Sequence, residues 1–142
     1  MNANNKEIAT KFIEEIWNQN QFDRLDNYIH PDFCDHSLPL ALPPNKEGLK
    51  LWIIGTGKSF EHKTIVEEMV SEENKIILKI KMLLKHIGNW RDLEPTGAEI
   101  FAIGYRYIKF ADNKIIEHWA LIDGNAIENQ LREAIHGCKI QE

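Results

Sequence analysis

The spacing of hydrophobic residues changes once along the chain, from a helical period to an alternating one. Apolar residues recur at helical spacing over residues 5–18 and 22–29, which predicts two amphipathic helices. Pro31 ends the second helix, because proline disfavours helical geometry in the residue before it. The first part of the chain is therefore expected to be helical.

An irregular segment separates these helices from a third. Residues 31–44 contain four of the five prolines, which predicts a long loop and a candidate pocket rim. A third helix should follow Asn45, with Gly55 and Gly57 ending it.

Beyond residue 60 apolar and polar residues alternate, as they do in strands. The clearest alternation runs over residues 75–86, where His86 continues the apolar phase. Asp112-Asn113 is a hairpin turn. The order of helices, antiparallel strands and a last helix predicts an α+β fold, with one domain over residues 1–142. The expected strands and last helix cover residues 61–70, 75–86, 98–110, 114–123 and 125–135.

One expected strand is apolar on both sides. Over residues 98–110, Ile100 and Ile108 share one phase while Phe101 and Tyr105 share the other. Both faces must then be covered, and the helices can cover only one. We therefore expect a homodimer that packs through the open face of the sheet.

Composition narrows the class of protein. The net charge of −5, with no block of Lys or Arg, argues against nucleic-acid binding. No apolar run approaches the roughly 20 residues that span a bilayer, and the N-terminus lacks an apolar signal segment. Cys34 and Cys138 are too few for a disulfide framework, so free thiols and a cytoplasmic location are expected.

Asp123 is the first candidate for chemistry. It ends the last expected strand, in phase with Trp119, and directly precedes a helix. It can therefore be an ordinary helix N-cap, or a carboxylate at the wall of an apolar pocket, where its basicity would be raised. These two alternatives stay open from the sequence.

Three histidines are the other candidates. His86 can be a satisfied core residue, or a donor to a substrate carbonyl. His36 lies in the expected loop and can be a turn residue or a substrate contact. His118 is out of phase with Asp123, so a regular strand would place the two on opposite faces. The aromatic residues, among them Phe33, suit a core or an apolar cavity.

No known metal or nucleotide motif occurs in the chain. HExxH, paired cysteines, GxGxxG and the P-loop pattern are all missing, so neither a metal nor another cofactor is expected. GxSxG is also missing, which argues against a serine hydrolase.

The order of several short motifs resembles the SnoaL-like polyketide cyclases, or ester cyclases. This family belongs to the superfamily of nuclear transport factor 2 and ketosteroid isomerase. The resemblance covers nearly the whole chain. It rests on Trp17-Asn18, Asp35-His36, Lys85-His86-Ile87-Gly88, Pro95-Thr96-Gly97, the segment 114–123 and Gln130-Leu131.

The resemblance implies a cone-shaped, curved antiparallel sheet, or α+β barrel, with helices packed on its concave side. It also implies homo-oligomers and an intramolecular aldol cyclisation without metal or cofactor, with Asp123 as the acid/base residue. His86 would then donate to the developing oxyanion, while His36, Trp119, Phe33 and His118 are candidates for substrate binding. The substrate would be a small, apolar carbonyl compound.

Two alternatives stay open. The same fold can serve as a non-catalytic module for ligand binding or dimerisation. It can also serve as a hydrolase or dehydratase that activates water, which would need further polar groups converging with Asp123.

Overall fold

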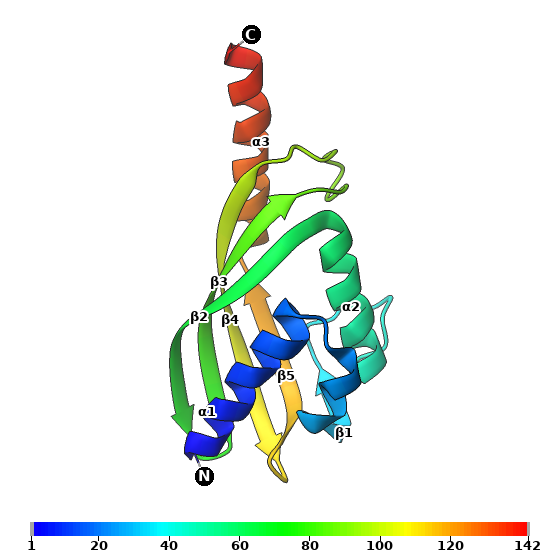
Figure 1. Ribbon diagram of the computed structural model, residues 1–142, viewed down its shortest axis with the longest axis vertical. Helices are drawn as coiled ribbons and strands as arrows, with labels where there is room; N and C mark the ends of the chain where they lie inside the picture. The colour runs from blue at the N-terminus through cyan, green and yellow to red at the C-terminus, as the bar shows by residue number, and fades with distance from the viewer. Residues whose placement is uncertain (1, 142) are drawn as a thin grey trace.

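The computed structural model describes residues 2–141, and side chains over residues 4–136. It contains a five-stranded sheet with helices before, within and after the strands (Figure 1). The helices are α1 (Asn2–Lys11), which continues as the π-helix η1 (Phe12–Asn18), the 3-10 helix η2 (Phe22–Asn27), α2 (Lys46–Ser59) and α3 (Gly124–Gln141). The strands are β1 (Ile29–Asp35), β2 (Phe60–Glu72), β3 (Lys75–His86), β4 (Glu99–Ala111) and β5 (Lys114–Ile122).

The sheet is open and strongly curved. Its strand order is β1-β5-β4-β3-β2, with β2 to β5 joined as antiparallel neighbours and β1 pairing parallel to β5. The α+β prediction is confirmed. The sheet differs from a barrel and from a purely antiparallel sheet because its ends do not close and one edge pair is parallel. Asp112 and Asn113 both have positive φ, which fits the predicted hairpin turn between β4 and β5.

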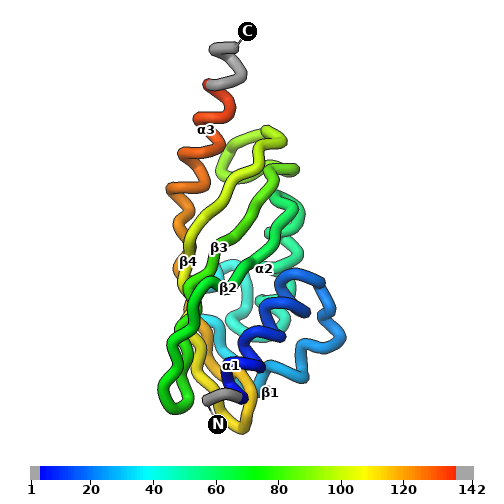
Figure 2. The backbone as a smooth tube through the Cα atoms, turned by 60° about the vertical axis from the view of Figure 1, so that its left-hand side comes forward, coloured from blue at the N-terminus to red at the C-terminus, as the bar shows by residue number. Residues whose placement is uncertain are grey.

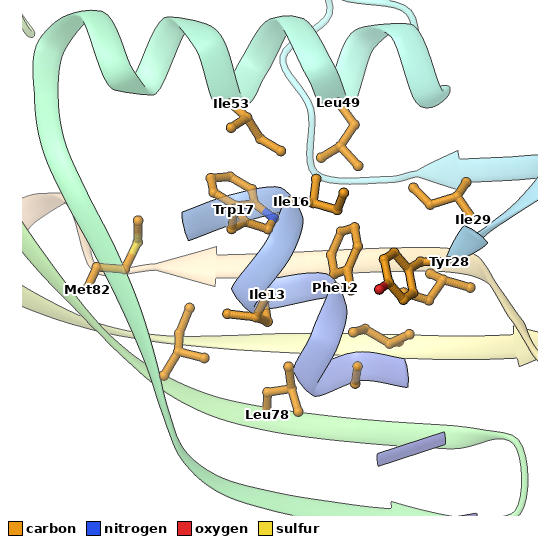
Figure 3. Packing of buried hydrophobic residues seen from close by; sticks show 14 of the residues in the cluster. Phe12, Ile13, Ile16, Trp17, Tyr28, Ile29, Leu49, Ile53, Leu78 and Met82 are labelled. Carbon is orange, nitrogen blue, oxygen red and sulfur yellow. The ribbon is translucent and has the colours of Figure 1, made fainter. Parts of the chain in front are cut away.

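The helices α1, η1 and α2 lie on the same side of the sheet (Figures 1 and 2). They fill the concave side with apolar side chains, so that Trp17 and Ile13 of η1 lie between α2 and the sheet (Figure 3). The predicted inward phase of β3 is confirmed, since every second residue from Ile76 to His86 is buried. No helix in the described part of the chain is long and apolar enough to cross a membrane.

The end of η1 is fastened to the edge strand β2. The side chain of Asn18 accepts from the backbone N–H of Thr64 at 2.8 Å and donates to its carbonyl at 2.9 Å. This pair of hydrogen bonds imitates a strand neighbour, so it fixes η1, and with it Trp17, against the sheet.

Two predictions from the first half of the chain are wrong. Residues 31–35, predicted as the start of the loop, belong to the strand β1, because β5 offers a free edge on which even a segment containing Pro31 can pair. The third helix also runs past Gly55 and Gly57 to Ser59, since neither glycine adopts a positive φ that would end it.

A close approach explains the glycine of the His86-Ile87-Gly88 motif. The backbone N–H groups of Ile87 and Gly88 both donate to the carbonyl of Ser59 at the end of α2. A Cβ on Gly88 would lie 2.1 Å from the carbonyl oxygen of Lys58. Glycine is therefore required where the end of β3 meets α2.

Candidate functional site

A cavity of about 520 Å³ opens on the concave side of the sheet, a size typical of small-molecule sites. Its walls come from η1, α2, all five strands and the start of α3. Most of the lining is apolar or aromatic, including Trp52, Phe60, Met82, Leu84, Trp90 and Ile122. Its charged or titratable lining residues are Asp35, Arg91, Arg106 and His118.

Three of these polar residues form a buried chain across neighbouring strands. The pairing of β1 with β5 places Asp35 beside His118, and β4 contributes Arg106 on the same face. Asp35 Oδ2 lies 2.9 Å from His118 Nδ1, and His118 Nε2 lies 3.3 Å from Arg106 Nη1. Each of the three residues is 2 % exposed. The sheet therefore presents a carboxylate, an imidazole and a guanidinium in line.

The neighbours of His118 fix its tautomer. A guanidinium can only donate, so His118 Nε2 accepts from Arg106 and Nδ1–H donates to the carboxylate of Asp35. Burial lowers the pKa of His118, although the hydrogen bond to Asp35 opposes this shift. The imidazole is therefore neutral at neutral pH, with its Nε2 lone pair on the guanidinium side.

Asp35 is ionised and fully hydrogen-bonded. Besides His118 it accepts from the backbone N–H of Ser37 at 2.9 Å and from the Ser37 hydroxyl at 2.6 Å. Burial would raise the pKa of Asp35, but the hydrogen bonds from His118 and Ser37 outweigh it, so this pKa is lowered. A carboxylate of this kind orients an imidazole and stabilises its protonated form.

Arg106 is the cationic member of this buried group of three side chains. Its guanidinium stacks over the ring of Trp17, 4.2 Å from the ring centroid. Burial lowers the pKa of Arg106 to about 10, while Asp35 acts in the opposite direction. The side chain therefore remains positively charged at neutral pH.

Asp123 lies on the other side of the sheet. Residues 118, 120 and 122 of β5 line the cavity, so the alternate positions, among them Trp119 and Leu121, face outward. Asp123 follows in the outward phase and borders a separate, open hollow with Tyr105 and Leu121. Its Oδ1 accepts from the N–H of Ala126 at 3.0 Å, so it caps α3. Of the two alternatives that the sequence left open, the structure shows the helix N-cap, and Asp123 is not among the residues that line the cavity.

His86 is buried but lies outside the lining of the cavity. Its Nδ1 accepts from the backbone N–H of Thr96 at 3.1 Å, and its ring packs 5.3 Å from that of Phe60. Burial lowers the pKa of His86. Its position is that of a core residue which ties the Pro95-Thr96-Gly97 turn to the end of β3.

The remaining predicted residues separate between the two faces. His36 stacks on Trp119 with ring centroids 4.4 Å apart, and its Nε2 lies 3.1 Å from Oε1 of Glu117. Neither ring lines the cavity. Phe33 is buried in the core, also outside the lining. Of the predicted substrate-binding residues, only His118 borders the cavity.

Arg106 and the role of Asp35 were missed by sequence reasoning. The signal for Arg106 was present, because a charged residue stands in the same phase as Ala102, Ile108 and Phe110. Asp35 had no comparable signal, since its strand was expected to be loop.

The described part of the chain contains no group of three or more His, Cys, Asp or Glu side chains placed to hold a metal ion. Cys34 is a free thiol, while the side chain of Cys138 lies outside the described residues.

A bent open sheet with helices on its concave side, and a cavity between the two, define the class of small α+β proteins built around a curved sheet. Residues 7–131 match the family of SnoaL-like polyketide cyclases, and the chain belongs to this family.

The chain is also similar to a named cyclase and shares its fold with solved structures. Aklanonic acid methyl ester cyclase AcmA of Streptomyces galilaeus is 24 % identical over 128 residues, which cover 88 % of this chain and 89 % of the relative. A proposed polyketide cyclase from Acidithiobacillus ferrooxidans has a TM-score of 0.81 at 22 % identity, covering 92 % and 96 % of the two chains. AclR of Streptomyces galilaeus, a proposed hydroxylase, has a TM-score of 0.80 at 21 % identity, covering 94 % and 98 %. The fold therefore also occurs in proteins with another proposed activity.

Proposed function

We propose that this chain is a polyketide cyclase-type enzyme, a cofactor-independent acid/base catalyst that acts on a small carbonyl compound in the cavity. The observation that carries the proposal is the buried chain of Asp35, His118 and Arg106 at the cavity wall. The cyclase family and the AcmA relative support the same reaction class.

In the proposed reaction His118 is the base. Its Nε2 takes a proton from the carbon next to a substrate carbonyl, and the resulting enolate attacks a second carbonyl of the same molecule. One carbon–hydrogen bond breaks and one carbon–carbon bond forms. The proton then passes from His118 Nε2 to the new alkoxide, so the substrate closes to a ring without net gain or loss of atoms. Asp35 stabilises the imidazolium, and the Arg106 cation stabilises the enolate oxygen.

His118 suits the role of base better than Asp35 does. The lowered pKa of Asp35 makes this carboxylate a weak base, and all of its described hydrogen bonds hold it in place. His118 is neutral and borders the cavity. Its 3.3 Å contact with Arg106 is long for a hydrogen bond, so an entering substrate can compete for Nε2.

The test compares His118 and Asp35, which line the cavity, with Asp123, the acid/base residue that the family resemblance implies. Aklanonic acid methyl ester, the compound in the name of the AcmA relative, is the first substrate to try. Exchange of α-protons of this compound in deuterated water reports proton abstraction even if no ring closes. His118→Asn and Asp35→Asn should lower the rate by about 10² to 10⁴-fold, while Asp123→Asn retains it within a few-fold. If Asp123→Asn abolishes the rate and His118→Asn leaves it intact, Asp123 is the base.

We also propose that two copies associate through the outward face of the sheet. Large apolar side chains are exposed there, with Val70 68 % and Leu121 76 % exposed and Phe101 and Tyr105 each 48 % exposed. Side chains of this size on a sheet surface are typical of an interface.

A non-catalytic dimerisation or ligand-binding role is the alternative if His118 and Asp35 prove dispensable for turnover. The free thiol of Cys34 further suits a cytoplasmic location.

A further inference from the structure

Arg106 is a buried cation without a carboxylate partner. The residue is 2 % exposed, and no salt bridge joins it to an acidic side chain among the described residues. Asp35, the carboxylate of the same buried group, is bound to the far side of the His118 ring and also accepts a hydrogen bond from Ser37. An uncompensated buried charge is costly, and the cost falls when an anion binds it directly.

Among the described residues, this guanidinium finds an acceptor for only a small part of its donors. It has five N–H donors, and its described hydrogen bond is the one from Nη1 to His118. Its Nε is buried without an acceptor among the described residues, and the same holds for Nε1 of Trp17, over whose ring the guanidinium lies. Both residues line the cavity. Two buried donors without acceptors therefore stand next to space that a ligand can enter.

We propose that the Arg106 end of the cavity binds the planar, singly charged acidic head of the ligand, namely a carboxylate or an ionised 1,3-dicarbonyl enol. The two groups share one chemistry, two coplanar oxygens that carry a single negative charge and match the fork of a guanidinium. This inference rests on the proposed function in taking the cavity as the substrate site, and it names the class of substrate.

The rest of the cavity suits the body of such a ligand. The lining beyond the polar chain includes Trp52, Phe60 and Trp90, which can contact a flat aromatic or polyketide skeleton. Arg91, the second arginine of the lining, differs from Arg106 in being 47 % exposed and bonded to Glu128. The unpaired cation is thus at the buried end, which orients the ligand with its acidic head inward.

The test measures binding with simple probes by calorimetry on the full chain. 2-Naphthoate is compared with the neutral 2-naphthamide, and 4-hydroxycoumarin, an enol ionised at neutral pH, is compared with neutral coumarin. At least one anion should bind roughly 10- to 100-fold more tightly than its neutral partner. A preference for naphthoate assigns a carboxylate head, and a preference for hydroxycoumarin alone assigns an enol.

Variants of the two arginines show which of them causes the preference for the anionic probe. Arg106→Met should abolish it, and Arg106→Lys should retain part of it, because a lysine keeps the charge without the fork. Arg91→Gln is the matched control and should keep the preference. Equal binding of anion and neutral probe to the unmodified chain overturns the proposal. So does a preference that survives Arg106→Met or disappears in Arg91→Gln. The comparison of probes on the unmodified chain holds even if Arg106→Met does not fold.

Failure of this inference is distinct from failure of the proposed reaction. If the anion preference is present but His118→Asn and Asp35→Asn leave proton exchange unchanged, the subsite stands and the reaction does not. If these variants abolish exchange but no anion is preferred, the reaction stands and the subsite does not. If the protein has both the anion subsite and the proposed activity, it should turn over the free acid of a substrate faster than its methyl ester.

Discussion

Each face of the sheet carries some side chains that are unusual for their exposure. The concave face buries charged and titratable groups, Asp35, Arg106 and His118, beside a cavity, while the convex face exposes large apolar ones such as Leu121. On β5 the neighbours His118 and Trp119 belong to opposite faces. The comparison teaches that hydrophobicity does not identify the functional face. A buried polar chain needs the shelter of the fold, and an exposed apolar face needs a partner.

The largest expected difference in stability is between substitutions at two neighbouring residues of β3. Leu78 is fully buried on the concave side, whereas Ile77 is 46 % exposed on the convex side. Leu78→Ala should lower the free energy of unfolding by about 2–5 kcal/mol, because it leaves a cavity in the core. Ile77→Ala should cost about 1 kcal/mol or less. Urea unfolding at several protein concentrations measures both, and equal losses would remove the distinction between the faces.

Acidic pH should destabilise the protein, because the concave side of the sheet buries neutral histidines. Burial lowers the pKa of His62, His86 and His118 below the ordinary 6.5. Below about pH 6.5 the unfolded chain therefore binds protons that the folded chain does not, so stability falls as the pH decreases toward the folded values. The lowered pKa of Asp35 adds a further loss below 3.8.

Thermal unfolding as a function of pH measures this dependence. In His118→Asn one of the three imidazoles is gone, so the fall in stability below pH 6.5 should be shallower than in the unmodified chain. A melting temperature that is constant from pH 7 to pH 5 would contradict the burial of neutral imidazoles.

Asp123 should behave as a residue of the helix terminus. Asp123→Ala removes the acceptor for the N–H of Ala126 and should cost about 1 kcal/mol of stability. Asp123→Asn keeps an acceptor and should cost less. If either variant changes the binding of a ligand in the cavity, the assignment of Asp123 to the convex side needs revision. Thermal unfolding and probe calorimetry on the same samples separate the two effects.

The smallest change in stability is expected on the convex face. Leu121→Lys replaces a side chain that is 76 % exposed and should alter the stability of a single copy by no more than about 0.5 kcal/mol. It should nevertheless dissociate the proposed dimer, because a charge would be buried in an apolar interface. Light scattering after size-exclusion chromatography measures the mass, and an unchanged dimer would place the interface elsewhere.

Periodicity alone determined most of the elements. The strand 75–86, the hairpin at Asp112-Asn113 and the first helix follow from spacing, since backbone geometry fixes the periods of helices and strands. The family follows from motifs spread along the chain. These features are local, or repeat at fixed intervals, so one sequence carries them.

Only the tertiary structure decided which groups meet. β1 forms because β5 offers it an edge, and this pairing of residues more than eighty positions apart places Asp35 beside His118. Asp123 is in phase with the apolar residues Trp119 and Leu121 of β5, a pattern that predicts the pocket side. These residues lie on the outward face instead, and Asp123 lies there with them. The inward phase bears the polar residue His118 and the small Ala120 where a cavity replaces packed core. Alternation fixes that two faces exist, but long-range packing chooses which of them is buried.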